Sequence, residues 1–152
     1  MSIELKVYDN GDHTCLIWLP SDLAAIPDCR GFAIERTRNG EKPNYLHGFV
    51  GFSDKDKLDP NNPWKFPVQR YMWWDYDIKL GDSVQYRVVP VVGKDQDNLS
   101  LKDDLASALT PVMITLGNSL HTYQRTSIRE LLPHNGFRAH WMQRQKDKAL
   151  KT

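Results

Sequence analysis

Cysteine is scarce in this chain of 152 residues, which contains only Cys15 and Cys29. Without evidence of export, two cysteines are better explained as reduced thiols than as a disulfide framework, although a single bridge remains an alternative. No apolar run approaches the roughly 20 residues that a membrane helix needs, so the sequence predicts no membrane span. The N-terminus carries charge from Glu4 and lacks the apolar segment of a signal peptide, so we expect a cytoplasmic protein.

The chain also lacks the short motifs that usually identify metal, phosphate and nucleophile sites. Its five histidines are not arranged with cysteines or carboxylates at metal-ligand spacing. Neither a glycine-rich phosphate loop nor a Gly-x-Ser-x-Gly segment is present. The acidic segment from Asp54 to Asp59 lacks the glycine and glutamate of a calcium loop, so we interpret it as solvated. We therefore expect no catalytic residue, no metal and no cofactor, and a chain that is not an enzyme.

Charge is distributed unevenly along the chain, although the formal net charge is only +1. Residues 1–116 contain 13 Lys and Arg against 17 Asp and Glu, whereas residues 117–152 contain 7 against 2. We therefore divide the chain into an acidic body, residues 1–116, and a basic C-terminal extension, residues 117–152, expected to be weakly helical or disordered. Alternatively, the extension contacts an anionic surface or the acidic body. No nucleic-acid partner is predicted.

Hydrophobic and polar residues alternate along the body, which predicts β-strands. The expected strands lie at residues 3–7, 14–20, 31–37, 45–52, 68–78, 80–92 and 111–115. Asn10-Gly11-Asp12 and Arg38-Asn39-Gly40 are typical hairpin turns, because glycine and asparagine tolerate positive φ. We expect antiparallel strands to meet at Leu80-Gly81-Asp82 as well.

About seven short strands of this kind predict an all-β fold, an immunoglobulin-like or fibronectin type III-like β-sandwich. Tyr86 stands just after a turn at the start of a late strand, where a "tyrosine corner" hydroxyl reaches back to upstream backbone groups. The sequence resembles fibronectin type III domains in three places: Leu80 six residues before Tyr86, Trp18 shortly before a proline, and "GFAIER" in the third strand. The paired cysteines of an antibody-type domain are not at their usual positions.

One group of aromatic residues is a candidate binding surface. Trp73 and Trp74 are adjacent, so they must point to opposite faces of their strand and only one of them easily joins the core. The candidate binding residues are Trp64, Trp73, Trp74 and Tyr76. Exposed aromatic rings on a sandwich suit a sugar or a protein partner, whereas the alternative is that loops cover them.

A narrower resemblance covers residues 3 to 116. "GFAIERT", "GFVGF" and "WKFPVQRYMWWDYDIKLGDSVQYRVVPVVG" are similar to the N-terminal domain of bacterial phospholipase D-like proteins. In that family the chemistry belongs to His-x-Lys-x-x-x-x-Asp motifs, and this chain has none, since His140 is followed by Trp141 and Met142. The resemblance therefore implies an accessory domain without its catalytic domain.

These observations predict a noncatalytic accessory or interaction module whose partner is a phospholipase D-like catalytic domain or another protein. The alternative is a fragment or subunit of a phospholipase D-like phosphodiesterase that is active only with a separate catalytic domain. A weaker alternative is a glycan-binding sandwich. The sequence does not separate a truncated gene product from a stand-alone protein.

Overall fold

A computed structural model describes residues 1–49, 51 and 53–115 of the chain. The chain divides into two units, Met1–Leu116 and Gly117–Thr152. The expectations about the basic extension, both its weak helicity and its contacts, lie outside the described residues.

The described residues form antiparallel β-strands and short 3₁₀ turns, with no α-helix among them. The strands are β1 (Ile3–Asp9), β2 (Thr14–Pro20), β3 (Cys29–Arg38), β4 (Asn44–Leu46), β5 (Met72–Asp75), β6 (Ser83–Val92), β7 (Ser100–Leu101) and β8 (Thr110–Met113). The 3₁₀ turns are η1 (Pro63–Lys65), η2 (Gln96–Asn98) and η3 (Asp103–Leu105). The all-β prediction is confirmed for this part of the chain.

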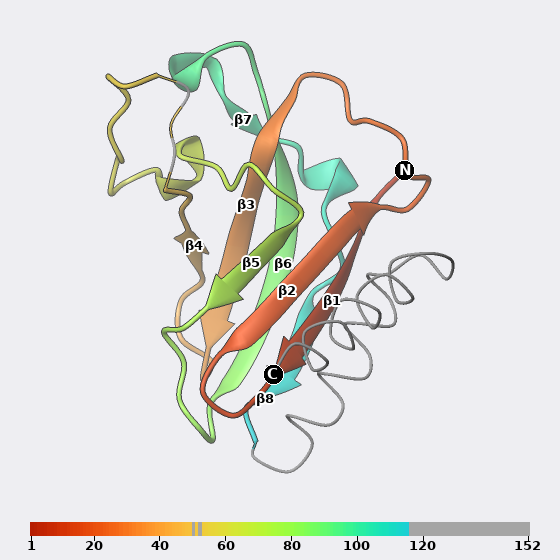
Figure 1. Cartoon of the computed structure of the whole chain (residues 1–152), viewed down its shortest axis with the longest axis vertical. Helices are drawn as coiled ribbons and strands as arrows, with labels where there is room; N and C mark the ends of the chain where they lie inside the picture. The colour runs from red at the N-terminus through yellow and green to blue at the C-terminus, as the bar shows by residue number, and fades with distance from the viewer. Residues whose placement is uncertain (50, 52, 116–152) are drawn as a thin grey trace, which may run out of the picture. The chain divides into compact units, whose positions relative to one another are not determined.

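The strands form two sheets, as Figure 1 shows. The first sheet has the order β1-β2-β5, and the second has the order β4-β3-β6-β7, with β8 also paired to β6. Side chains from both sheets meet in one hydrophobic core, in which Leu16 and Trp18 of β2 face Ile34 of β3 and Val84 and Val88 of β6. Alternation on each strand sends every second side chain into this core, as the sequence predicts.

Two predicted hairpins are present. β1 pairs with β2 across the Asn10–Gly11 turn, in a register that aligns Val7 with Leu16. β3 pairs with β4 after a turn in which Asn39 and Gly40 both have positive φ, 49° and 74°. Two consecutive residues with positive φ are the signature of the tight hairpin turn that matches strand twist.

The turn at Leu80-Gly81-Asp82 does not join a hairpin, so that prediction is wrong. β5 pairs with β2 in the first sheet, whereas β6 pairs with β3 in the second. The turn instead carries the chain from one sheet to the other. A turn residue indicates where a strand ends. Which strand pairs with the next one depends on how the apolar faces of both strands are buried in the core.

Two predicted strands are shorter than expected. The strand expected at residues 45–52 ends at Leu46, and only Met72–Asp75 of the strand expected at residues 68–78 is regular. Val68 forms an isolated bridge to Phe32 of β3, and four residues later Met72 pairs with Ile17 of β2. The chain therefore changes sheets between Val68 and Met72, which interrupts the regular strand.

Glycines allow this crossing segment to approach its neighbours closely. A Cβ on Gly31, whose φ is +148°, would lie 2.7 Å from the Val68 carbonyl oxygen. A Cβ on Gly48 would lie 2.4 Å from the carbonyl oxygen of Pro67. Neither distance is tolerated, so glycine is required at both positions for the segment to lie where it does.

A smaller hydrophobic cluster lies on the outer face of the second sheet. Its buried members are Ala33, Val89, Val91 and Leu99, and Trp64 of η1 packs against them. The long connections before β5 and after β6 supply most of the cover. This face is therefore a second, satellite core rather than an exposed surface.

Candidate binding site

The two adjacent tryptophans of β5 lie on opposite faces of the strand. Trp73 packs against the core between the sheets, and its ring centroid is 5.1 Å from that of Phe49. Trp74 points the other way, where its ring contacts His13 and Tyr76. Strand alternation places one tryptophan on each face, so the partly buried Trp73 packs against the core and Trp74 lies on the outer face.

His13, Trp74 and Tyr76 form a cluster of rings that we name the aromatic patch. The Trp74 and Tyr76 rings are nearly parallel, with 16° between their planes and 6.4 Å between their centroids. The His13 ring lies 5.2 Å from that of Trp74 and 5.0 Å from that of Tyr76. Tyr76 is 70% exposed. The patch therefore offers one largely accessible ring that rests against two others.

Strand register brings these residues together. β2 pairs with β5 so that Thr14 lies opposite Asp75 and Cys15 opposite Trp74. His13 and Tyr76 are the next residues beyond this pairing, at the same end of the sheet. Cross-strand neighbours of this kind are close enough for ring contact.

The turn before β2 fixes the orientation of the His13 ring. The His13 Nδ1 atom lies 2.6 Å from Asp12 Oδ1, and Nε2 lies 3.1 Å from the Asn10 side-chain nitrogen. Because an amide nitrogen can only donate, Nε2 is the acceptor, and the proton of the neutral ring is on Nδ1, which donates to Asp12. The Asn10 side-chain oxygen also accepts from the backbone N–H of His13. The patch is therefore held by side-chain hydrogen bonds as well as by ring contact.

The structure does not bring all four sequence-predicted residues together. Trp64 covers the satellite core on the outer face of the second sheet, with the Lys65 ammonium 5.9 Å from its ring centroid. Trp73 lies at the core, and only Trp74 and Tyr76 share a surface. The two outer faces of a two-layer fold point in opposite directions, so Trp64 and the aromatic patch cannot contact one small ligand.

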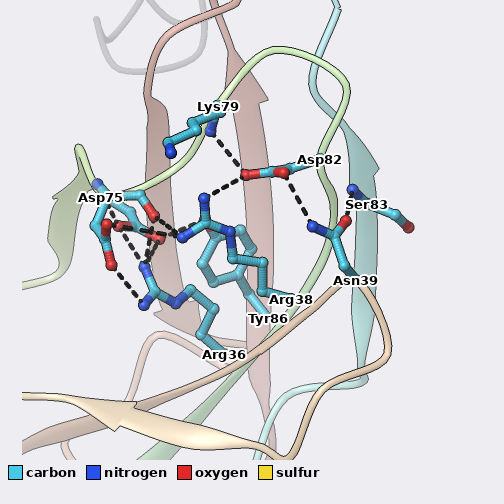
Figure 2. A network of polar contacts seen from close by, with 9 residues as sticks. Arg36, Arg38, Asn39, Asp75, Lys79, Asp82, Ser83 and Tyr86 are labelled. Atoms are coloured by element: carbon cyan, nitrogen blue, oxygen red, sulfur yellow. Dashed lines mark hydrogen bonds and ion pairs between the residues drawn. The ribbon is translucent and has the colours of Figure 1, made fainter.

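A buried polar cluster anchors β5 at Asp75, which lies between Trp74 and Tyr76 in the sequence, and Figure 2 shows Arg36, Asp75 and Tyr86 of this cluster. Arg36 Nη1 donates to both carboxylate oxygens of Asp75, at 2.9 and 3.0 Å, and Nη2 donates to Asp77 Oδ2 at 3.0 Å. The Tyr86 hydroxyl donates to Asp75 Oδ2 at 2.7 Å. Arg36, Asp75 and Tyr86 are almost completely buried. The cluster links β3 and β6 of the second sheet to β5 of the first.

The Tyr86 hydroxyl departs from the predicted tyrosine corner. It bonds the Asp75 carboxylate and lies 2.8 Å from Thr14 Oγ1, so its partners are side chains and not upstream backbone groups. A buried carboxylate is a stronger acceptor than a backbone carbonyl, which explains the preference. Burial, followed by the charge of Asp75, raises the pKa of Tyr86 far above its ordinary value.

The polar cluster continues to the turn at the end of β3. Arg38 Nη2 lies 2.9 Å from Asp82 Oδ2, and the Asn39 side chain donates to Asp82 Oδ1 at 3.0 Å. The Lys79 backbone N–H also donates to Asp82 at 2.8 Å. The hydrogen bond from Asn39, then that from Lys79, lowers the pKa of Asp82, with Arg38 adding to the effect. In its ionised form Asp82 therefore stabilises two turns, the one after β3 at Asn39 and the one from Lys79 to Asp82.

His13 and Asp12 belong to the site although sequence reasoning did not select them. Their signal in the sequence is the Asn-Gly turn that begins the second strand. That turn predicts a hairpin, but it does not predict that β5 pairs with the far side of β2. The pairing of distant strands is a tertiary property that local patterns do not encode.

Cys15 and Cys29 are not joined by a disulfide. Burial raises the pKa of the Cys29 thiol. Within residues 1–49, 51 and 53–115, no group of three His, Cys, Asp or Glu side chains is placed to hold a metal ion. In the same ranges, no helix has the length and hydrophobicity that crossing a bilayer requires.

Comparison with known proteins adds no relative to this description. No protein-family model matches the chain, and no curated protein matches its sequence.

Proposed function

We propose that the body of this chain is a noncatalytic, fibronectin type III-like accessory module. The observation that carries the proposal is the division of strands between the sheets. β1, β2 and β5 lie in one sheet and β3, β6 and β8 in the other, as strands A, B and E and strands C, F and G do in immunoglobulin-like sandwiches. β4 pairs with β3 and so extends the second sheet.

The proposed relative is the N-terminal domain of bacterial phospholipase D-like proteins. The support is the sequence similarity, of which the longest segment runs from Trp64 to Gly93 and includes β5 and β6. Asp75 of β5 and Tyr86 of β6 are buried polar side chains of this segment, and the Asp75 carboxylate accepts hydrogen bonds from Tyr86 and from the buried Arg36 of β3. Their arrangement supports a role in the scaffold rather than in a reaction.

The proposal is tested by affinity capture with the full chain as bait in extract of the native organism. We expect it to recover a phospholipase D-like catalytic subunit. An Asp75→Ala bait, which loses the buried ion pair between the two sheets, is the destabilised-module control. Failure of the folded wild-type chain to retain any such subunit would contradict the proposal.

A phosphodiesterase assay separates this module from an enzyme subunit. We expect the isolated chain to show only background hydrolysis of a phosphodiester substrate. If adding the captured subunit produced turnover that the subunit alone lacks, the alternative of a divided phosphodiesterase would replace the accessory role. A His-x-Lys motif encoded directly downstream of Thr152 would support a severed N-terminal domain.

A further inference from the structure

Among the described residues, the aromatic patch is a surface feature that the scaffold does not explain. Tyr76 lies one residue beyond the end of β5 and is 70% exposed, so neither strand pairing nor the core requires its ring. Tyr71, at the other end of β5, is 49% exposed, but its ring packs on Phe32, a core residue. The contrast indicates that Tyr71 covers the core and that Tyr76 serves another purpose.

The orientation of the Tyr76 ring is set before any ligand arrives. The ring lies nearly parallel to Trp74 and within 5.0 Å of His13, whose own ring is fixed by Asp12 and Asn10. A ring held in this way loses little side-chain entropy on binding. Pre-organised aromatic faces of this type match flat ligands with an apolar face.

Polar groups border the ring on the His13 side. Asp12 accepts from the His13 ring, yet its side chain remains 81% exposed, so the carboxylate has free capacity to accept further hydrogen bonds. A sugar ring combines an apolar face of C–H groups with hydroxyl donors around its edge. The combination of an exposed aromatic face and an accessible carboxylate fits that chemistry better than it fits a purely apolar ligand.

Charge restricts the class of sugar. The exposed carboxylate of Asp12 lies 2.6 Å from the His13 ring of the aromatic patch, Asp77 follows Tyr76 and is also exposed, and residues 1–116 carry an excess of four acidic residues. Uronic and sialic acids would bring a second carboxylate toward this region and would be repelled. Neutral hexoses carry no such penalty.

We propose that the aromatic patch binds a neutral saccharide, with the sugar ring stacked on Tyr76 and its hydroxyls donating to Asp12. Trp74 and His13 contact the Tyr76 ring and support it. The inference deepens the proposed function, because it names the ligand class of the accessory module's exposed surface. A protein partner at the patch is the competing outcome.

The test is a glycan array probed with the full chain, followed by calorimetric titration of the best soluble oligosaccharide. We expect neutral oligosaccharides to be retained and uronic or sialic acid glycans to be absent from the hits. Tyr76→Ala should weaken binding about tenfold or more, as expected for loss of a stacking contact of roughly 1.4 kcal/mol. Tyr76→Phe should retain binding, because it keeps the ring.

Two further variants distinguish a loss of glycan binding at the patch from a general loss of stability. Asp12→Asn changes an exposed group and should weaken binding without changing the thermal unfolding midpoint. Tyr71→Ala, the matched exposed tyrosine, should leave glycan affinity unchanged. The proposal is overturned if the wild-type chain retains no neutral glycan, or if Tyr76→Ala binds as tightly as wild type.

The failure of this inference is distinguishable from the failure of the proposed function. Capture of a phospholipase D-like subunit by Tyr76→Ala should equal capture by wild type if the patch serves sugars. Loss of that capture, together with an empty glycan array, would instead make the patch a protein contact and leave the accessory role in place.

Discussion

Neighbouring residues of β3 and β6 build two ion-pair clusters on opposite faces of the second sheet. The inner cluster joins Arg36 to Asp75, with side-chain exposures of 7% and 3%. The outer cluster joins Arg87 to Asp103 at 2.8 Å and to Glu35 at 3.7 Å, and the Asp103 side chain is 61% exposed. The Arg–Asp distances are nearly equal, so burial is the main difference between the clusters.

One-residue alternation along β3 and β6 separates the side chains between the sheets from those on the outer surface. Glu35 and Arg36 are consecutive, as are Tyr86 and Arg87, yet each pair is divided between the two faces. A charge removed from water must be compensated by its partner, whereas an exposed charge is already solvated. The inner cluster therefore links the two sheets through compensated buried charges, and we expect the outer cluster to add less stability.

The largest effect is expected from Asp75→Ala. It removes the buried carboxylate partner of the Arg36 guanidinium, which keeps only the exposed Asp77 as an anionic partner, and it should lower the free energy of unfolding by about 3–5 kcal/mol. Urea unfolding followed by tryptophan fluorescence measures this loss. A loss below about 1 kcal/mol would mean that water replaces the carboxylate and that the inner cluster is not a determinant of the fold.

Tyr86→Phe is expected to have the next largest effect. It removes the hydroxyl between Asp75 and Thr14 while keeping the ring in the core, and should cost about 1–3 kcal/mol. The matched control is Tyr45→Phe, which removes a hydroxyl that bonds Glu35 on the outer face. Equal losses in the two variants, measured by urea unfolding, would remove the distinction between the faces.

Acid should weaken the fold partly through Asp82. The pKa of Asp82 is lowered in the folded state, so its stabilising effect is complete above its ordinary value of 3.8 and is lost as the pH falls further. Asp82→Asn should therefore be less stable than wild type at neutral pH. The difference between the two proteins should shrink below pH 3.8, and a constant difference would argue against the assignment.

The smallest effect is expected from Arg87→Ala. Arg87 and Glu35 are partly buried but the closer partner, Asp103, is exposed, so the loss should be below about 1 kcal/mol and should shrink in high salt. A double-mutant cycle with Glu35→Ala isolates the pairwise contribution. A coupling energy above about 2 kcal/mol would place the outer cluster among the fold determinants after all.

Local alternation predicted which side chains share a face of each strand. It did not predict which side chains of other strands those faces contact. Val84, Tyr86 and Val88 share the core face, as the sequence indicates, and Trp73 and Trp74 lie on opposite faces. The burial of Arg36 was not foreseeable, because its compensating carboxylate lies far along the chain in β5. An arginine in an alternating segment is predicted to be exposed unless a buried carboxylate partner is known.

The sequence predicted only part of the aromatic patch, because local alternation does not show which strands pair. Trp74 and Tyr76 are two residues apart in one predicted strand, so local alternation places them on the same face, although β5 itself ends at Asp75. His13 comes from the partner strand and depended on the β2–β5 register. Trp64 belongs to a separate surface because the chain changes sheets between Val68 and Met72, a crossing that follows from the close approach allowed at Gly31 and Gly48.

The interleaving of the two sheets has a consequence for synthesis on the ribosome. The β1–β2 and β3–β4 hairpins are local and can form as soon as they emerge, but β2 must wait for β5, and β3 for β6. Pairings between distant segments form slowly, because closing the long loop between them costs chain entropy before native contacts can compensate for it. Nascent chains that end before Val92 therefore present two half-covered hairpins to chaperones, and the fold closes only late in translation.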